Sequence, residues 1–429
     1  MTGKIQSVRG MRDILPPESQ HWQYLERTLA EVLTGYGYQQ IRTPVLEPTA
    51  LFTRSIGEVS DIVQKEMYTF EDRNGDSLTM RPEGTASSVR AFIEHGLSQH
   101  LPLRLWYTGP MFRHERPQKG RYRQFHQLGI EVFGLTGPDI DAELILLTRA
   151  FWAALGIAGL TLEINSLGTA ETRARYRDTL KAYFEPHRAR LDEDSLLRLE
   201  KNPLRILDSK NPELAELISQ APSLTDALDD DARAHFDGLL NTLTACGVEF
   251  VVNPRLVRGL DYYTHTVFEW KTAALGAQDT VCAGGRYDGL IESFGAKPVP
   301  AVGFAAGLER LLALLPPPPA ELTTQADLYV VLANDDPATS MTMVEALRQA
   351  LPGQRILAHC GGGSMKSQMK KADRSGARYA LVIGAAELAE RRYALKPLRE
   401  DLPQETFDLD TLSARLTAQA AAEESTQSE

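Results

Sequence analysis

Four consecutive prolines, Pro316–Pro319, are the feature that most constrains how this chain of 429 residues can fold. Proline fixes φ and lacks a backbone N–H, so such a run cannot continue a helix and favours the stiff polyproline II conformation. A chain of this length also exceeds what one hydrophobic core usually organises. We therefore expect a linker at 316–319 between a first domain, residues 1–325, and a second domain, residues 327–420, with a polar tail at 421–429.

The two expected domains differ in their patterning. From residue 38 to about 167, and again from residue 248, short β-rich runs alternate with turn signals, which predicts a mainly antiparallel sheet. Residues 169–243 between them are charged and helix-forming, and are expected to be a helical insertion. Beyond the prolines, strand-like and helix-like runs alternate as in a small α/β domain. The expected fold class is α+β.

Composition narrows the classes of function. The most apolar stretch, near residues 144–160, is interrupted by Arg149, so we expect no association with a membrane. The three cysteines lack metal-ligand spacing, which favours idle thiols in a reducing cytoplasm. A formal charge of −11 argues against indiscriminate nucleic-acid binding, so local basic clusters become informative. Neither a GxxxxGK[ST] loop nor a GxGxxG turn after a strand is present, so an ATP site would need another solution.

One basic cluster lies in FRHERPQKGRYRQFHQLGIEVFG, residues 112–134, between two strand-like runs. A loop that contains a glycine carries five cations and a single anion, Glu115; the cations are Arg113, Arg116, Lys119, Arg121 and Arg123. Such a hairpin could hold phosphates, although a solvated turn rich in arginine is the alternative. A second cluster, in GGGSMKSQMKKADRSGAR near residues 361–378, is either a solvated helix face or a contact for RNA backbone.

The strand after the hairpin loop carries the next signal. Alternation with period two places Phe125, Gln127, Gly129 and Glu131 on one face, and mostly apolar residues on the other. Two polar side chains that flank a glycine on a buried strand would leave space for a ligand and supply groups to bind it. An exposed sheet face is the alternative.

Three later segments are compatible with a ligand site, but each by itself is weak evidence for one. Arg258 precedes a glycine in LVRGLDYYTHTVFEW, and an extended chain there would turn Tyr262 and Tyr263 to opposite faces, so that at most one enters a given pocket. CAGGRYDGL predicts a tight bend in a sheet, near a ligand or purely structural. Arg310 in VGFAAGLERLLALL falls in a first helical turn, where it opposes the helix dipole unless an anion lies near.

Taken together, five segments closely resemble those of the histidyl-tRNA synthetases, members of the class II aminoacyl-tRNA synthetases. The resemblance extends to about residue 420, and its segments are TMRPEGT at 79–85, the arginine-rich hairpin, RGLDYY, AGGRYD and GFAAGLERL. It implies an antiparallel-sheet catalytic domain with a helical insertion and a C-terminal α/β anticodon-binding domain. GYGYQQIRTPVLEP resembles the segment through which the family forms dimers, so a homodimer is implied.

The resemblance also implies roles for single residues in a histidine–tRNA ligase that uses ATP and Mg²⁺. Glu83 and Thr85 would hold the ammonium of L-histidine, Gln127 its carboxylate, and Glu131 and Tyr263 its imidazole, with Tyr262 in the same site. Arg113 and Arg258 would act on the α-phosphate and Arg310 on the other phosphates. Arg116, Gln118 and Lys119 would meet the acceptor end of tRNA(His). The principal rival is a catalytically dead paralogue of these synthetases that serves as a histidine-sensing regulatory subunit of ATP phosphoribosyltransferase. Such paralogues generally lack the C-terminal domain and degrade the phosphate-binding arginines. A purely RNA-binding protein would leave Gln127 and Glu131 unexplained.

Overall fold

The structure is a computed structural model that divides into two compact units, Met1–Pro317 and Pro318–Glu429. It describes side chains as far as residue 418 and the backbone of residues 4–426 except for residues 58–59, 61, 119, 208, 210, 261, 277–278, 318–325 and 334–335. Pro318 and Pro319 of the expected linker therefore lie outside the described residues.

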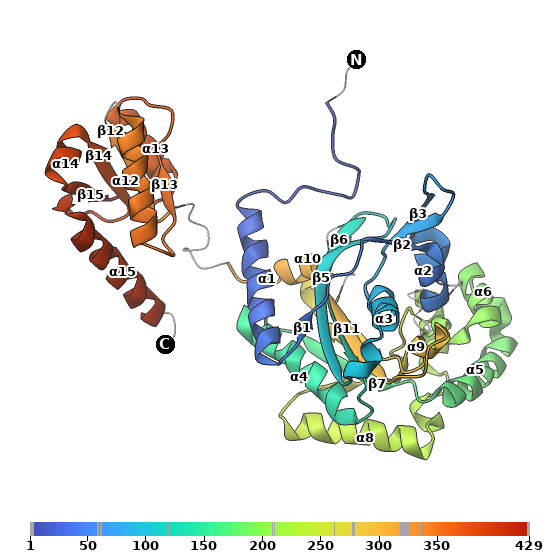
Figure 1. Cartoon of the computed structure of the whole chain (residues 1–429). Helices are drawn as coiled ribbons and strands as arrows, with labels where there is room; N and C mark the ends of the chain where they lie inside the picture. The colour runs from blue at the N-terminus through green and yellow to red at the C-terminus, as the bar shows by residue number, and fades with distance from the viewer. Residues whose placement is uncertain are drawn as a thin grey trace. The chain divides into compact units, whose positions relative to one another are not determined.

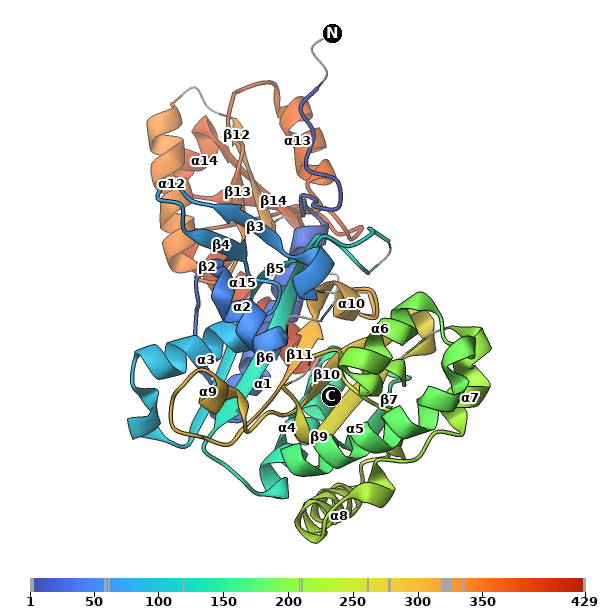
Figure 2. The ribbon, with the colours of Figure 1, turned by 90° about the vertical axis from the view of Figure 1, so that its right-hand side faces the viewer.

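An eight-stranded sheet forms the centre of the first unit. Its strands are β1 (Gln39–Gln40), β5 (Leu103–Phe112), β6 (Gln124–Phe133), β7 (Thr161–Ser166), β8 (Val251–Val252), β9 (Thr264–Lys271), β10 (Thr280–Arg286) and β11 (Ala301–Gly307). The six central strands run antiparallel in the order β5-β6-β11-β10-β9-β7, and β1 and β8 add short parallel edges. Figure 2 shows the middle strands side by side. Because each strand is pleated, its successive side chains point to opposite faces of the sheet.

Long amphipathic helices cover one face of this sheet (Figure 1). They are α1 (Glu18–Gly35), α4 (Pro138–Leu155) and α8 (Asp230–Ala245). The short helix α10 (Leu308–Leu312) packs into the same core. Their apolar residues, such as Leu25 and Phe151, form one buried core with Leu128, Ile130 and Val132 of β6. Each such side chain stabilises the fold by roughly 1.5–3 kcal/mol. No helix in the described part of the chain is long and apolar enough to cross a membrane.

Shorter elements lie around the other face of the sheet. They are α2 (Thr49–Ile56), α3 (Thr85–Glu94), α9 (Leu290–Ser293) and a three-stranded antiparallel sheet of β2 (Leu46–Pro48), β3 (Tyr68–Glu71) and β4 (Ser77–Met80). Residues of α3 and α9, such as Phe92 and Ile291, belong to a second core. A cavity on this face is lined by residues of the main sheet and by Thr85 of α3.

The segment between β7 and β8 is helical. Besides α8 it contains α5 (Ala170–Phe184), α6 (Glu193–Lys201), α7 (Ala215–Ser219) and 3₁₀ turns at Glu185–Arg190, Pro203–Ile206, Pro212–Leu214 and Thr225–Ala227. Side-chain oxygens of Thr169, Asp192 and Asp229 cap the starts of α5, α6 and α8 by accepting a backbone N–H. Helices α5 to α7 pack into the second core, whereas α8 packs beside α4 in the first. The segment therefore adjoins both faces of the sheet.

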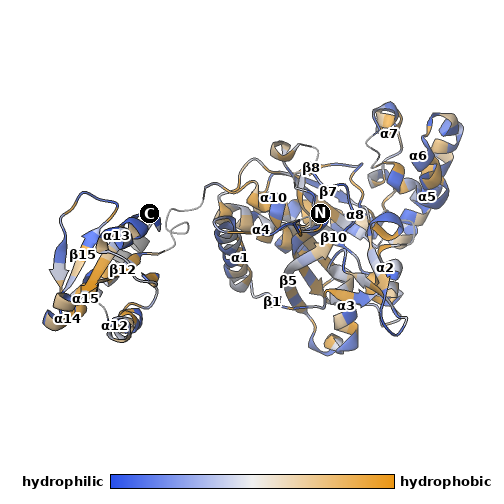
Figure 3. Cartoon of the chain, turned by 90° about the horizontal axis from the view of Figure 1, so that it is seen from above, coloured by the Kyte–Doolittle hydropathy of each residue, from blue (hydrophilic) through white to orange (hydrophobic). Residues whose placement is uncertain are grey.

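The second unit is a small α/β domain. Its sheet has the order β13-β12-β14-β15-β16, with the first three strands parallel. The elements are β12 (Leu328–Ala333), α12 (Pro337–Ala350), β13 (Ile356–Ala358), α13 (Met365–Arg374), β14 (Tyr379–Gly384), α14 (Ala385–Glu390), β15 (Tyr393–Pro397), β16 (Glu405–Phe407) and α15 (Leu409–Thr426). Helices α12 and α15 cover one face, and α13, hydrophilic over most of its surface in Figure 3, covers the other. Helix α15 continues into the segment expected as a polar tail.

Candidate active site

A cavity of about 200 Å³ lies on the face of β6 opposite α1 and α4. Its walls come from the β5–β6 hairpin, β10, β11, the start of α3 and the segment before β9. The residues predicted for a site that line it are Glu83, Thr85, Arg113, Gln127, Arg258, Tyr262, Tyr263 and Arg310. One cavity therefore gathers side chains that are up to 227 residues apart in the sequence, from Glu83 to Arg310 (310 minus 83).

Glu131 lies behind the wall of this cavity and is held by two tyrosines. The hydroxyl of Tyr107 on β5 donates to Oε1 of Glu131 at 3.1 Å, and the hydroxyl of Tyr287 donates to Oε2. Burial raises the pKa of Glu131 to about 8, because the charged form is shielded from water. Tyr107 and Tyr287 line the cavity and were not predicted from the sequence. The sequence offered one signal, the tyrosine inside AGGRYD, whereas the pairing of Tyr107 with Gly129 appears in the folded sheet.

The glycine on β6 does not leave space for a ligand, which corrects the sequence-based interpretation. A Cβ on Gly129 would overlap the ring of Tyr107, and a Cβ on Gly84 would overlap the same ring. Gly303 on β11 is limited in the same way by the carboxylate of Glu131. These glycines therefore make room for the Tyr107–Glu131 pair, and the ligand space lies beyond it.

We expect Gly129→Ala to destabilise the first unit, since the new methyl group must displace the buried Tyr107 ring from Glu131. Overpacking of this kind lowers the free energy of unfolding by about 1–3 kcal/mol, which urea-induced unfolding followed by circular dichroism would measure. Gly35→Ala is the matched control, because a Cβ at Gly35 meets nothing within 4 Å. Equal stabilities of the two variants would contradict the packing described here.

Two further polar groups face the cavity, Gln127 from the sheet and Glu83 from the segment just before α3. Glu83 accepts the backbone N–H of Thr85 at 2.6 Å and that of Ala86 at 2.9 Å, so its carboxylate caps α3. Burial raises the pKa of Glu83. Oε1 of Gln127 is buried and, among the described residues, has no hydrogen-bond partner. A buried acceptor without a partner costs about 1–3 kcal/mol, so a donor from a ligand would satisfy it.

Arg258 is held at the cavity by a carboxylate of the sheet. One of its terminal nitrogens donates to Glu269 of β9, whose other oxygen accepts the hydroxyl of Thr280 at 3.1 Å. Its guanidinium carbon also lies 5.7 Å from the ring centre of Tyr263. Burial alone would lower the pKa of Arg258, but Glu269 outweighs this and raises it. Glu269 was not predicted from the sequence, because the register of β9 against β10 places it there.

Arg113 and Arg310 add two more cations to the same cavity. Arg113 donates from Nε to the carbonyl of Pro82 at 2.9 Å, and Arg310 donates to the carbonyls of Gly120 and Thr280. Burial lowers the pKa of both, and for Arg310 the proximity of Arg113 lowers it further. An anionic ligand would relieve this repulsion between cations.

Comparison with known proteins shows the family of this chain. The family model described as Histidyl-tRNA synthetase matches residues 10–311, which is more than half of the chain. The chain belongs to the histidyl-tRNA synthetase family. The model described as Anticodon binding domain matches residues 327–419, in the second unit. The predicted family and the predicted α+β fold class, with an antiparallel-rich sheet and a C-terminal α/β domain, are therefore confirmed.

Solved structures of several proteins are similar to this chain. The apo histidyl-tRNA synthetase of S. aureus is 36% identical, with a TM-score of 0.79 over 96% of this chain and 99% of that one. The histidyl-tRNA synthetase of Nostoc sp. PCC 7120 is 22% identical, with a TM-score of 0.69 over 97% and 100%. A protein of Bacillus halodurans, described as an ATP phosphoribosyltransferase regulatory subunit/histidyl-tRNA synthetase, is 24% identical, with a TM-score of 0.63 over 86% and 97%. The last two likenesses show the fold alone.

The tyrosine pair of this family member departs from the expectation that only one ring enters a given pocket. Tyr262 and Tyr263 both line the cavity, with ring centres 4.7 Å apart. The reason is that Tyr262 lies in a turn and strand β9 begins only at Thr264, so the backbone is not extended there. The prediction from strand alternation was therefore wrong.

The hairpin loop places its remaining predicted residues away from the cavity wall. Arg116 and Gln118 are exposed and are not lining residues, and Gln118 pairs through its backbone with Arg121. Arg121 forms an ion pair with Glu115, and both line the cavity. Lys119 lies outside the described residues. The exposed side chains at 116 and 118 are thus accessible to a partner larger than ATP.

Proposed function

We propose that this chain is a histidine–tRNA ligase, which activates L-histidine with ATP to histidyl-adenylate and transfers histidine to the 3′ end of tRNA(His). The observation that carries the proposal is the shared cavity, which places three arginines next to a buried carboxyl group flanked by tyrosines. Arginines suit phosphates, and a carboxyl and phenol cluster suits the two nitrogens of an imidazole. Family membership supports the use of ATP.

Histidine binding is assigned to the groups on the sheet and α3. Glu83 and Thr85 would hold the ammonium, because the Glu83 carboxylate has lone pairs left after capping α3. Gln127 would donate its amide N–H groups to the carboxylate, which leaves its buried Oε1 for a donor elsewhere on the ligand. Glu131, Tyr262 and Tyr263 would bind the imidazole, with Tyr107 and Tyr287 fixing Glu131. A site that pairs both ring nitrogens rejects analogues lacking them by roughly 10⁴–10⁵.

Activation needs positioning and charge stabilisation more than proton transfer. A carboxylate oxygen of histidine attacks the α-phosphorus, the bond to the β-phosphate breaks, and pyrophosphate leaves. The carboxylate is already ionised, so no general base is needed. Arg113 and Arg258 would stabilise the α-phosphate and Arg310 the other phosphates, and Mg²⁺ would arrive on ATP as part of the substrate. No group of three or more His, Cys, Asp or Glu residues that could hold a metal ion was found among the described residues.

Transfer requires the tRNA to reach the same cavity. A terminal ribose hydroxyl attacks the carbonyl carbon of the adenylate, its proton passes to a phosphate oxygen, and AMP leaves. The exposed Arg116 and Gln118 would contact the acceptor end, together with Lys119, which lies outside the described residues. The second unit would bind the anticodon, and the basic residues of α13 suit RNA phosphates.

A homodimer is also proposed, in the cytoplasm. The small sheet presents apolar residues at paired positions on one face, and Leu46 and Phe70 there are 41% and 45% exposed. Exposed apolar patches of this kind commonly mark contacts between proteins. In a dimer with two-fold symmetry, this surface would pack against the same surface of a second copy of the chain.

The alternative is a histidine-binding regulatory subunit of ATP phosphoribosyltransferase, which the name of the B. halodurans relative raises. The residues of this chain favour the ligase, because Arg113, Arg258 and Arg310 are all present in the cavity and the anticodon-binding model matches the second unit. The deciding experiment is ATP–pyrophosphate exchange with each of the twenty amino acids supplied singly. Exchange with histidine alone supports the ligase, and no exchange with any amino acid supports the regulatory subunit.

Removal of residues from Asp327 onward should separate the two steps of the reaction. We expect histidine-dependent exchange to remain, since the cavity lies wholly in the first unit, and aminoacylation of tRNA(His) to fall by about 10²-fold or more as anticodon contacts are lost. Both rates are measured on the same preparation, and the full chain is the control. Unchanged aminoacylation would contradict the anticodon-binding role.

A further inference from the structure

The fourth residue of AGGRYD, Arg286, is unused in the scheme above and is the largest fully buried side chain of the first unit. Each of its three guanidinium nitrogens donates a hydrogen bond. Nε and Nη2 donate to Oδ1 of Asp141 at 3.1 and 2.6 Å, and Nη1 and Nη2 donate to the carbonyls of Leu135 and Gly137 at 2.9 and 3.0 Å. Nη1 also donates to Asp288 at 3.2 Å. Such complete pairing fixes the guanidinium in a single orientation.

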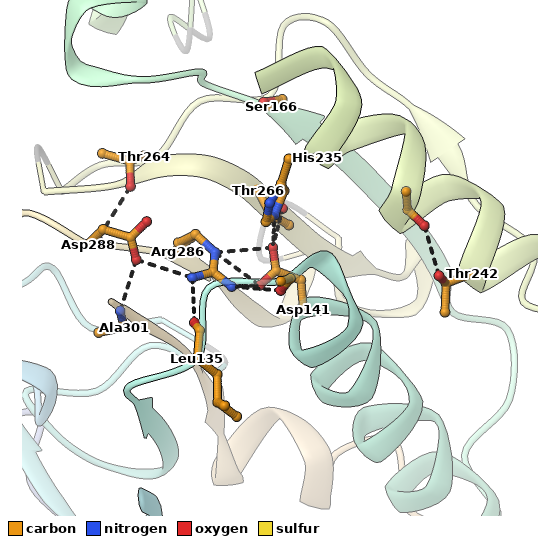
Figure 4. Close-up of polar contacts among 12 residues, drawn as sticks. Leu135, Asp141, Ser166, His235, Thr242, Thr264, Thr266, Arg286, Asp288 and Ala301 are labelled. Atoms are coloured by element: carbon orange, nitrogen blue, oxygen red, sulfur yellow. Dashed lines mark hydrogen bonds and ion pairs between the residues drawn. The ribbon is translucent and has the colours of Figure 1, made fainter. Parts of the chain in front are cut away.

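Asp141, in the first turn of α4, is itself held from two further elements (Figure 4). Its Oδ2 accepts the hydroxyl of Thr266 on β9 at 2.6 Å and pairs with Nε2 of His235 on α8 at 2.7 Å. Burial would raise the pKa of Asp141, but His235 and Arg286 outweigh it and lower the pKa below its usual value. The carboxylate is therefore charged and joins α4, α8, β9 and β10.

The pair sits where the main sheet is irregular. Gly285 pairs with Val267 but Arg286 pairs with Thr264, so two residues of β9, His265 and Thr266, have no partner on β10. His265 has a φ of 45°, a conformation that is strained for any residue other than glycine. A bulge of this kind changes the direction of side chains, and bulges are common beside active sites. Here it aims Thr266 at Asp141.

Tyr287 follows Arg286 directly and points the other way. Tyr287 lines the cavity, whereas Arg286 lies with α4 and α8 on the far side of the sheet. The backbone N–H of Tyr287 donates to Ala301 at 2.8 Å, and Asp288 on its other side accepts the N–H of Ala301 at 2.9 Å. The residues before and after Tyr287 are thus both anchored, which leaves its hydroxyl little freedom other than to face Glu131.

We propose that Asp141 and Arg286 are positioning residues that hold Tyr287, and through it Glu131, in place to receive the histidine side chain. Thr266 and His235 hold the carboxylate of Asp141 for this task, so α8 contributes to amino-acid recognition without touching the cavity. The inference rests on the proposed function to the extent that histidine is the ligand. It predicts a defect in histidine binding that spares ATP.

The test uses the full chain with Thr266→Val and His235→Ala, because removal of Arg286 or Asp141 could prevent folding. We expect either variant to raise the Kd for L-histidine by about 2- to 30-fold and to leave the Kd for MgATP within about twofold, as measured by titration calorimetry. His235→Gln, which keeps an N–H donor near the position of Nε2, should restore histidine affinity. Glu143→Gln, which removes the charge of another α4 ion pair, is the matched control and should bind both ligands normally.

A double-mutant cycle shows whether the effect passes through Tyr287. Tyr287→Phe should weaken histidine binding on its own, and its combination with Thr266→Val should be less than additive. Additive effects, or lower melting temperatures with an unchanged Kd for histidine, would overturn the inference and leave a purely structural network. If the wild-type protein binds histidine without catalysing exchange, the ligase proposal is refuted. The Kd values of the variants then still decide whether Asp141 and Arg286 position Tyr287. Wild-type protein that does not bind histidine would refute both.

Discussion

Arg258→Ala is expected to lower the rate of histidyl-adenylate formation by about 10³- to 10⁵-fold, the range found when an arginine that stabilises a transferring phosphoryl group is lost. The guanidinium faces the cavity from a fixed position, because Glu269 binds one of its terminal nitrogens and Tyr263 lies beneath it. Its buried Nε has no partner among the described residues, which leaves a donor for a phosphate oxygen. Single-turnover adenylate formation with radiolabelled ATP measures the effect.

The same substitution should be tolerated by the fold. Glu269 loses its arginine but keeps the hydroxyl of Thr280 at 3.1 Å and Nζ of Lys271 at 3.4 Å, so its charge stays paired. We therefore expect a melting temperature within a few degrees of that of the wild-type protein. In larger domains, a change of 1 kcal/mol in the free energy of unfolding shifts the melting temperature by about 2–4 °C.

A nearby arginine supplies the control for Arg258→Ala. Arg255 donates to the carbonyls of Ser219, Ala221 and Pro222 and does not line the cavity, so Arg255→Ala should cost stability and spare adenylate formation in the folded fraction. If Arg258→Ala made adenylate at a near-normal rate, the assignment of the phosphate site would be wrong.

Local sequence patterns predicted much of the fold and part of the candidate site. The alternation in residues 124–133 predicted which side chains of β6 face the core, because period two holds wherever a strand has one buried face. The same alternation gave a wrong prediction for the two tyrosines before β9. It assumed an extended strand, but Tyr262 lies in a turn and β9 begins at Thr264. Strand patterning thus fails at strand ends, where ligand-binding residues often lie.

What could not be predicted depends on contacts between distant segments. Tyr107 reaches Glu131 because β5 flanks β6, and Tyr287 reaches it because β10, which Tyr287 follows, is separated from β6 by β11 alone. Glu269 reaches Arg258 only through the register of β9. The glycine at 129 was a correct signal of close approach, but the sequence cannot say whether a ligand or a tyrosine ring makes it. Pairing order decides such questions, and it is a property of the whole sheet.

Glu131→Gln is expected to stabilise the fold while lowering kcat/KM for histidine by about 10²- to 10³-fold, since loss of one partner from a buried charged hydrogen bond costs 2–5 kcal/mol. Glutamine keeps the shape of the side chain between Tyr107 and Tyr287 but cannot carry the charge that the imidazole would meet. Exchange assays at varied histidine concentration measure the loss. Gln127→Glu, on the same face of β6, tests whether any carboxylate facing the cavity would serve, and adding it to Glu131→Gln should not restore activity.

The gain in stability should depend on pH with a defined sign. Burial raises the pKa of Glu131 to about 8 from an ordinary 4.5, so between these values the folded chain binds more protons at this site than the unfolded chain. The wild-type protein must therefore lose stability relative to Glu131→Gln as the pH rises from 4.5 to 8, and the difference should level off above that. Thermal unfolding of both proteins at pH 5 and pH 8 checks this, with a gap at least about 3 °C wider at pH 8. A gap independent of pH would mean that Glu131 is ionised in the free protein, and that the tyrosine hydroxyls alone stabilise its charge.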